Sequence, residues 1–322
     1  MNTALLSLLI ALIIDTVIGD PQWIYHPVRL IGGLASVLEK LTRKIIRNEI
    51  AAGITAWWGV VSLVVVVSGG LLLAASALGA APFVAVSSLC IYFSIAPRDL
   101  AKHAASAARA LKENDLEAAR ERTGRMVSRD THGLNKNELI KAVVESTAEN
   151  LVDGVTAPLL FAAVFGPLGA VVYRAVNTMD AMFGYKNEKY IKFGRFAAKA
   201  DDFLTWLPAR LTGPLLCLTA PVVRASVRSA FEIMLRDRKN HDSPNGGIVE
   251  SATAGALGIR LGGPGTYFGA EVIKPYLGDQ AKRPAVSDIR KTIVMMYGTT
   301  ILILALSVLI VILKTNVVER IL

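Results

Sequence analysis

Long uncharged blocks separate the polar parts of this chain and predict its helices. Between Ile50 and Pro97, 48 residues pass without Asp, Glu, Lys or Arg. One membrane span needs about 20 apolar residues, so this block predicts two helices with a turn near Gly79. The 22 uncharged residues Thr292–Leu313 predict another span. Asn2–Gly19 lacks the basic start and the cleavage site of a signal peptide, and we favour a retained first helix over that alternative.

Two further apolar blocks are interrupted by helix breakers. Gly154–Tyr173 contains Pro158, Gly166 and Pro167, and Leu204–Val223 contains three prolines. Broken backbone at membrane depth is tolerated only where other protein or water covers its polar groups. Both blocks are therefore expected to be re-entrant or buried segments.

Composition supports a membrane protein. Hydrophobic residues make up 53% of the chain and charged residues 19%, and the mean hydropathy is +0.46. These values exclude a disordered chain, a disulfide scaffold and an ordinary soluble enzyme. We expect an all-α polytopic integral membrane protein with about four full spans, two Pro/Gly-broken segments and helical loops. Residues 1–322 are expected to form one domain, with a helical cytoplasmic segment at 98–153 and a cytoplasmic substrate-binding loop region at 225–290. No sequence alternation predicts a sheet.

The net charge of +9 is concentrated in the loops. Basic loops favour the cytoplasmic side, which predicts a cell-membrane protein with both termini outside and its active site facing the cytoplasm. Basic clusters also suit nucleic acid, but no recognition motif accompanies them, so no nucleic-acid partner is expected. Cys90 and Cys217 lack the spacing of a metal or redox motif and are interpreted as buried hydrophobic residues.

Polar clusters border the apolar blocks, and an acid inside an apolar helix suggests function. Asp15 is such an acid, although pairing with Arg29 is an equal alternative. Glu145, Glu149 and Asp153 follow one another at four-residue spacing, which places them on one helical face. Such oxygen ligands suit Mg²⁺ together with substrate phosphates, whereas a charged helix end paired with neighbouring Arg or Lys is the structural alternative.

These clusters lie in strings that resemble the cobalamin-biosynthesis family of adenosylcobinamide-phosphate synthases, the CbiB/CobD family. The strings extend in the family's order from Asp15 to Pro264: DTVIGDP, HPVRLIG, SRDTHGL, VESTAENLVDGVTAPL, YRAVNTMDAMFGYKN, DDFLTWLPARLT and HDSPNGGIVESATAGALGIRLGGP. The resemblance implies a membrane amide ligase. Its substrates would be the corrinoid adenosylcobyric acid, through its free propionate, and (R)-1-amino-2-propanol or its O-phosphate, with ATP as the energy source.

Roles for individual residues follow as hypotheses from this chemistry. The metal would be held by Glu149, Asp153 and Asp180, with Glu145 as an alternate ligand or a catalytic group. Phosphates would be held by Arg129, Arg174, Lys186 and Arg238. His26 or His241 would accept a proton from the amine, and Asp20, Arg29 and Asn245 would orient substrate. The remaining candidates for substrate or phosphate binding are Asp130, Asn150, Asn177, Tyr185, Asp201, Asp202, Arg210, Ser243 and Glu250.

All these side chains are expected to converge in one pocket. The lipid bilayer is an expected partner, as are a second copy of the chain and other enzymes of the same pathway. Two other classes stay open. A transporter would explain the broken apolar blocks, and a membrane signalling protein would explain the spans but not the dense polar clusters.

Overall fold

The computed structural model describes residues 2–20, 26–267 and 269–321. The chain divides into two compact units, each assembled from separate stretches of sequence. Unit 1 contains residues 1–96, 157–205 and 304–322, and unit 2 contains residues 97–156 and 206–303. The all-α membrane class predicted from the sequence is confirmed, because helices make up most of the described chain.

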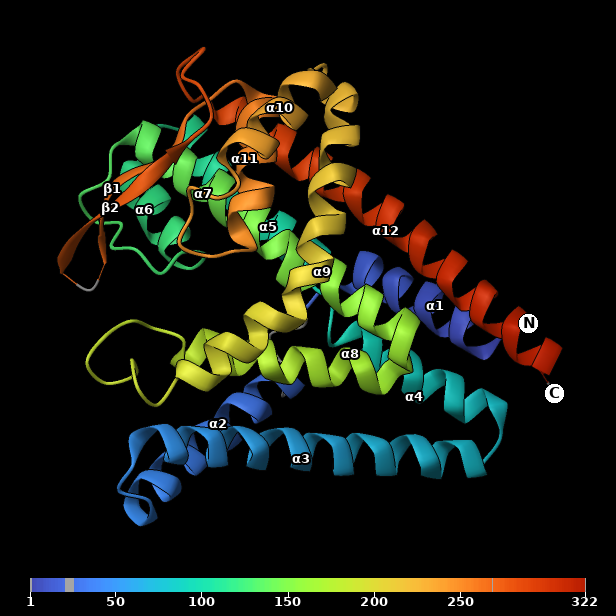
Figure 1. Ribbon diagram of the computed structural model, residues 1–322. Helices are drawn as coiled ribbons and strands as arrows, with labels where there is room; N and C mark the ends of the chain where they lie inside the picture. The colour runs from blue at the N-terminus through green and yellow to red at the C-terminus, as the bar shows by residue number, and fades with distance from the viewer. Residues whose placement is uncertain (1, 21–25, 268, 322) are drawn as a thin grey trace. The chain divides into compact units, whose positions relative to one another are not determined.

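Unit 1 is a group of helices (Figure 1). It comprises α1 (Thr3–Ile18), α2 (Pro27–Ile45), α3 (Glu49–Ala77), α4 (Ala80–Tyr92), α8 (Ala157–Phe183), the first part of α9 (Arg195–Thr219) and the last part of α12 (Val286–Ile321). One face each of α2, α3 and α8 forms a shared core around Ala35, Ala56 and Val176. Gly53 of α3 permits this packing, because an added Cβ would lie 1.9 Å from the carbonyl oxygen of Phe193.

Four helical stretches of the described chain are long and apolar enough to cross a membrane: residues 49–77, 80–112, 136–183 and 286–317. The predicted turn at Gly79 is confirmed, since this residue lies between α3 and α4 with a φ of 112°. The number of candidate spans agrees with the prediction, but one member differs. The N-terminal helix Thr3–Ile18 is a shorter apolar helix, and the stretch containing the first broken block takes its place.

The two broken blocks differ in structure. Within α8 the backbone leaves helical geometry at Gly166, whose φ is 76°, and the helix resumes at Pro167. The predicted break is therefore present there. The second block was expected to be broken as well, but α9 continues through Pro208 and Pro214 and ends at Thr219. A proline removes one helical hydrogen bond and bends a helix without necessarily ending it.

Unit 2 surrounds a second core. Its helices are α5 (Pro97–Lys112), α6 (Leu116–Gly124), α7 (Lys136–Leu151), α10 (Val227–Asp237) and α11 (Gly246–Leu257), with a π-helical turn η1 (Val152–Thr156), a 3₁₀ turn η2 (Ala220–Val223) and the remaining parts of α9 and α12. Side chains such as Leu111, Val143 and Leu257 fill the core from α5, α7 and α11. The helix-rich stretch Ala101–Arg122 forms α5 and α6, which are separated at Asn114, where φ is 57°.

A small sheet in unit 2 corrects the expectation that none exists. Strands β1 (Leu261–Tyr267) and β2 (Ala270–Leu277) pair antiparallel as a hairpin (Figure 1). The sequence hides β1 because it is rich in glycine and lacks alternation of apolar and polar residues. Gly262 and Gly263 adopt positive φ values of 73° and 96°, a conformation that glycine permits at no steric cost. The register shift between Leu261 and Gly263 lies at this point.

Candidate active site

Helix α7 contributes two carboxylates to the candidate site in unit 2. A capping box of Asn135 and Glu138 starts this helix, and Glu145 and Glu149 follow one helical turn apart. Asp153 lies beyond the end of α7, in the π-helical turn Val152–Thr156. A π-turn adds one residue to the turn and changes which side chains share a face. The single carboxylate face predicted from the sequence therefore ends after Glu149.

Glu145 holds three parts of unit 2 together. Its side chain is 7% exposed and forms an ion pair with Arg129, whose side chain is 9% exposed. Its Oε1 also accepts a hydrogen bond of 2.7 Å from the backbone N–H of Gly262 in β1. Burial opposes the charge of Arg129, but the charge and hydrogen bond of Glu145, together with Tyr267 and Glu250, raise the pKa of the guanidinium. These contacts occupy both carboxylate oxygens, which favours a positioning role for Glu145 and Arg129 over contact with substrate.

Asp130 attaches the other end of the hairpin. Its Oδ2 accepts a 2.9 Å hydrogen bond from the N–H of Gly269, and its own N–H donates to the carbonyl of Thr266 at 2.8 Å. Asp130 therefore holds backbone in this structure. Asn150 is likewise occupied locally, because its amide donates to the carbonyl of Ser146 at 2.9 Å within α7.

His241 and Glu250 form a buried pair beside α7. Their side chains are 6% and 5% exposed, and His241 Nε2 lies 3.3 Å from Glu250 Oε1. His241 Nδ1 lies 3.0 Å from the backbone nitrogen and 3.3 Å from the carbonyl oxygen of Ser243, and a protonated ring would donate to the carbonyl. Burial opposes protonation of His241, but the hydrogen bond and charge of Glu250, with the charge of Glu149, raise the pKa of His241 to about 9. Burial also raises the pKa of Glu250, so the pair retains a proton at neutral pH.

The loop before α11 places His241 close to Glu149. Ser243 Oγ accepts the N–H groups of Asn245 and Gly246, at 3.3 and 3.1 Å, and so caps the start of α11. A Cβ at Gly246 would lie 3.2 Å from His241 Cε1 and 3.4 Å from Glu149 Oε1. Glycine at this position therefore permits the imidazole and the carboxylate to lie on the same side of the helix start.

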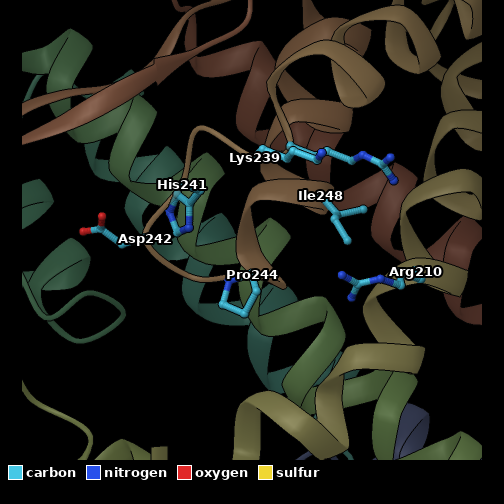
Figure 2. A pocket seen from close by; sticks show the side chains of 7 residues that line it. Arg210, Lys239, His241, Asp242, Pro244 and Ile248 are labelled. Atoms are coloured by element: carbon cyan, nitrogen blue, oxygen red, sulfur yellow. The ribbon is translucent and has the colours of Figure 1, made fainter. Parts of the chain in front are cut away.

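A basic cavity of about 420 Å³ lies next to this pair (Figure 2). Its lining consists of Arg210, Arg238, Lys239, His241, Asp242, Pro244 and Ile248. In Figure 2, Arg210 enters from α9, and the carboxylate of Asp242 points away from it. The Arg210 guanidinium lies 4.0 Å above the Trp206 ring and donates to Asn245 Oδ1 at 3.4 Å. Burial and the charge of Arg238 lower the pKa of Arg210, so an anion placed here would relieve repulsion between the two guanidinium groups.

The hairpin adds two residues that the sequence analysis missed. Lys274 Nζ lies 5.1 Å from the centre of the Tyr267 ring. Burial opposes the charge of Lys274, but its hydrogen bond to Tyr267 and the charges of Glu250 and Glu149 raise the pKa of this lysine. The charge of the Lys274 ammonium therefore interacts with the carboxylates of Glu250 and Glu149. The sequence gives no sign that Lys274 lies near Glu149 and Glu250. The hairpin register, which pairs Lys274 with Gly263, places it there.

Other predicted residues lie together in unit 1. Arg174 donates to the carbonyl of Ser94 at 2.9 and 2.6 Å and to Asn177 Oδ1 at 3.3 Å. The Asn177 amide donates to Asp201 Oδ1, also at 3.3 Å. Burial raises the pKa of Asp201. These contacts form a polar network between the end of α4, α8 and α9.

The remaining unit 1 candidates have local contacts. Burial raises the pKa of Asp202, and the charge of Lys186 partly offsets this. His26 accepts the N–H of Val28 at 3.3 Å and lies 3.6 Å from Asp20. Asp180 folds back toward Gly184, where an added Cβ would lie 2.0 Å from its Oδ1. Arg29 is exposed in the first turn of α2, and Tyr185 lies half-buried after α8.

The predicted residues therefore form a network in each unit. Glu145, Glu149, His241 and Glu250 cluster in unit 2, and Arg174, Asn177 and Asp201 cluster in unit 1. No three His, Cys, Asp or Glu side chains within the described ranges come together as a metal-binding group. The expected set of Glu149, Asp153 and Asp180 is split between the units, so its metal role stays a prediction.

Comparison with known proteins gives the family. A model described as CobD/Cbib protein matches residues 8–296. The chain belongs to the CobD/Cbib family. No solved structure matches it.

The CobD/Cbib relatives cover nearly the full length. A protein of Clostridium perfringens is 44% identical over 289 residues, which are 89% of this chain and 92% of that protein. A Geobacter metallireducens protein is 43% identical over 307 residues, 95% of this chain and 96% of that protein. A Klebsiella pneumoniae protein is also 43% identical over 307 residues, with 94% and 96% covered. All three are named Cobalamin biosynthesis protein CobD.

Proposed function

We propose that this CobD/Cbib protein is an ATP-dependent amide ligase of cobalamin biosynthesis. It would join the free propionate of adenosylcobyric acid to (R)-1-amino-2-propanol or its O-phosphate. Family membership and the names of its relatives support the pathway, and they favour an enzyme over a transporter or a signalling protein. The observation that supports the chemistry is the basic cavity beside the buried His241–Glu250 pair.

The reaction needs an activated carboxylate, because a carboxylate and an amine do not condense in water. The propionate oxygen would attack the γ-phosphorus of ATP, ADP would leave, and an acyl phosphate would form. The amine nitrogen would then attack the acyl carbon, phosphate would leave, and the ammonium proton would pass to a base. Cationic side chains stabilise the charge that develops on the transferring phosphoryl group. Arg210, Arg238 and Lys239 are the cavity residues with that property.

The buried pair suits phosphate binding better than proton abstraction. A His241 with a pKa near 9 remains protonated at neutral pH, so it would add positive charge beside a phosphate and not accept the amine proton. Lys274 would add a second cation on the hairpin side. His241 is therefore not assigned as the base of the proposed reaction.

Magnesium would enter with the nucleotide. This ion usually takes one or two protein carboxylates and keeps phosphate oxygens and water as its other ligands. Glu149, beside His241 and Gly246, fits that limited requirement, and Asp153 is a second candidate. The ion would neutralise charge on the phosphates. The basic loops favour a cell-membrane location with this site on the cytoplasmic side.

The direct test uses the purified full chain in detergent. Adenosylcobyric acid, the amine, ATP and Mg²⁺ should give the amide, detected by mass spectrometry. Arg238→Gln should lower product formation at least tenfold, because charge-assisted contacts to phosphate are among the strong ones. Arg283→Gln removes an exposed charge outside the cavity lining and should leave the rate near that of the unaltered chain.

Two outcomes would count against the proposal. Absence of product with an active homologue as positive control would reject the ligase reaction. Equal rates for Arg238→Gln and Arg283→Gln would reject the basic cavity as the phosphate site while leaving the reaction itself standing.

A further inference from the structure

The outer face of α2 in unit 1 has a stripe of large apolar side chains. Leu30, Val37, Leu41 and Ile45 are 56%, 61%, 48% and 70% exposed. Their spacing of seven, four and four residues places them along one side of the helix. The opposite side, which includes Ala35, is already packed in the unit 1 core. The stripe is therefore a second apolar surface of the same helix, additional to the one that the fold uses.

Three basic side chains border this stripe. Lys40, Lys44 and Arg47 are exposed and make no hydrogen bond or ion pair with any residue that the structure describes. Lys40 and Lys44 lie on the flank of Val37 and Leu41 and not on the buried side of α2, and Arg47 follows the end of the helix at Ile45. Apolar and cationic side chains thus lie side by side at the C-terminal end of α2, which is the pattern of a helix end at a membrane surface.

Arg43, a fourth cation in the same stretch, is bound by other residues of the protein. Its Nη1 lies 2.8 Å from Glu49 Oε2, and its Nη2 donates to the carbonyl of Lys189 at 2.7 Å. Its guanidinium also lies 4.5 Å from the centre of the Phe193 ring. The protein thus satisfies one of four neighbouring cations internally and leaves the other three available.

The position of α2 along the chain places these charges at the bilayer boundary. Arg47 precedes by two residues Glu49, where α3 begins as a candidate span. The Asn48 side chain accepts the N–H groups of Ile50 and Ala51, both at 3.0 Å, and fixes the start of that helix. The basic residues therefore lie where a span begins, at the depth at which lipid phosphates are found.

We propose that the outer face of α2 is a binding site for anionic phospholipid. Acyl chains would cover Leu30, Val37, Leu41 and Ile45, and the headgroup phosphate would lie against Lys40, Lys44 and Arg47. Charge complementarity and continuity with the bilayer around α3 select this occupant. The site is independent of the ligase reaction proposed above, since it lies in unit 1 and its residues have no part in that chemistry.

The test compares lipids that differ only in headgroup charge. The purified full chain in detergent is titrated with phosphatidylglycerol or phosphatidylcholine of the same acyl chains, and bound lipid is counted by native mass spectrometry. The unaltered chain should prefer phosphatidylglycerol. Lys40→Gln/Lys44→Gln/Arg47→Gln should lower that preference at least about tenfold, since each basic residue near an anionic surface adds appreciable attraction. Raised salt should weaken the preference of the unaltered chain.

A matched control removes the same charge elsewhere. Lys102, Arg109 and Lys112 are exposed on α5, a helix with no large exposed hydrophobic residue. Lys102→Gln/Arg109→Gln/Lys112→Gln should keep the preference for phosphatidylglycerol. Lys40→Arg/Lys44→Arg/Arg47→Lys keeps the charge on α2 and should keep it as well.

The outcomes are distinct. Loss in the α2 glutamine variant alone supports the site. An unchanged preference in that variant, or an equal loss in the α5 control, overturns the proposed lipid site. A loss in the charge-conserving variant also overturns it, because it shows that α2 itself is damaged and that charge is not the cause.

Discussion

The buried Arg129–Glu145 pair allows a quantitative test of how unit 2 is held together. Arg129→Met removes the guanidinium but keeps a side chain of similar length. Glu145, whose side chain is 7% exposed, would then be a buried carboxylate facing no cation. Removing one partner of a buried pair costs about 3–5 kcal/mol. We expect the free energy of unfolding to fall by that amount.

The same chain contains an exposed pair for comparison. Arg125 and Glu121 are 61% and 67% exposed in an i,i+4 pair, and exposed pairs contribute about 0–1 kcal/mol. Arg125→Met should therefore change the free energy of unfolding by less than 1 kcal/mol, an estimate for exposed pairs. The measurement is unfolding in mixed detergent micelles, followed by circular dichroism.

A double variant separates charge from hydrogen bonding. Glu145→Gln retains a carbonyl oxygen for the N–H of Gly262 but removes the charge. Arg129→Met/Glu145→Gln should therefore be more stable than Arg129→Met alone. The reasoning is refuted if Arg129→Met costs no more than Arg125→Met, or if the double variant is the least stable of the set.

Three further predictions concern pH and backbone. The free energy of unfolding of unit 2 should fall as pH rises from 6.5 to about 9. Folding raises the pKa of His241, and the stabilisation that this residue provides requires its proton. His241→Gln should reduce this pH dependence in a series of unfolding curves. Asp201→Asn should lessen the loss of unit 1 stability above pH 3.8, since burial raises the pKa of this carboxyl, and half-buried Asp202→Asn should have the smaller effect in the same series. Gly166→Ala should lower the melting temperature, because a φ of 76° costs a non-glycine residue about 1–3 kcal/mol, whereas Gly33→Ala, with open space at its Cβ, should raise it.

The sequence predicted features that depend on composition or on one residue type. Uncharged blocks of sufficient length predicted α3, α4 and the apolar part of α12 without reference to any tertiary contact. The predicted turn near Gly79 and the predicted break at Gly166 both lie at glycines that adopt a positive φ in the structure. Proline was less informative, since α9 tolerates Pro208 and Pro214 within one continuous helix.

For the candidate site, the sequence predicted which residue types take part but not the contacts between them. Periodicity placed Glu145 and Glu149 on one face of a helix. It could not show that the carboxylate of Glu145 is bound by Arg129 and by the N–H of Gly262. The contact between α7 and β1 joins residues 117 positions apart, and it depends on a hairpin that no alternation in the sequence reveals. Lys274 was missed for the same reason.

The hairpin's attachment has a consequence for how this protein can change. Glu145 and Asp237 accept the N–H groups of Gly262 and Gly278 at its base, both at 2.7 Å, and Asp130 accepts that of Gly269 near its tip. All three carboxylates hold main chain and none holds a strand side chain. Ile273, which is 75% exposed, takes no part in these attachments, so substitutions at such outward positions are expected to leave the placement of the hairpin in unit 2 unchanged.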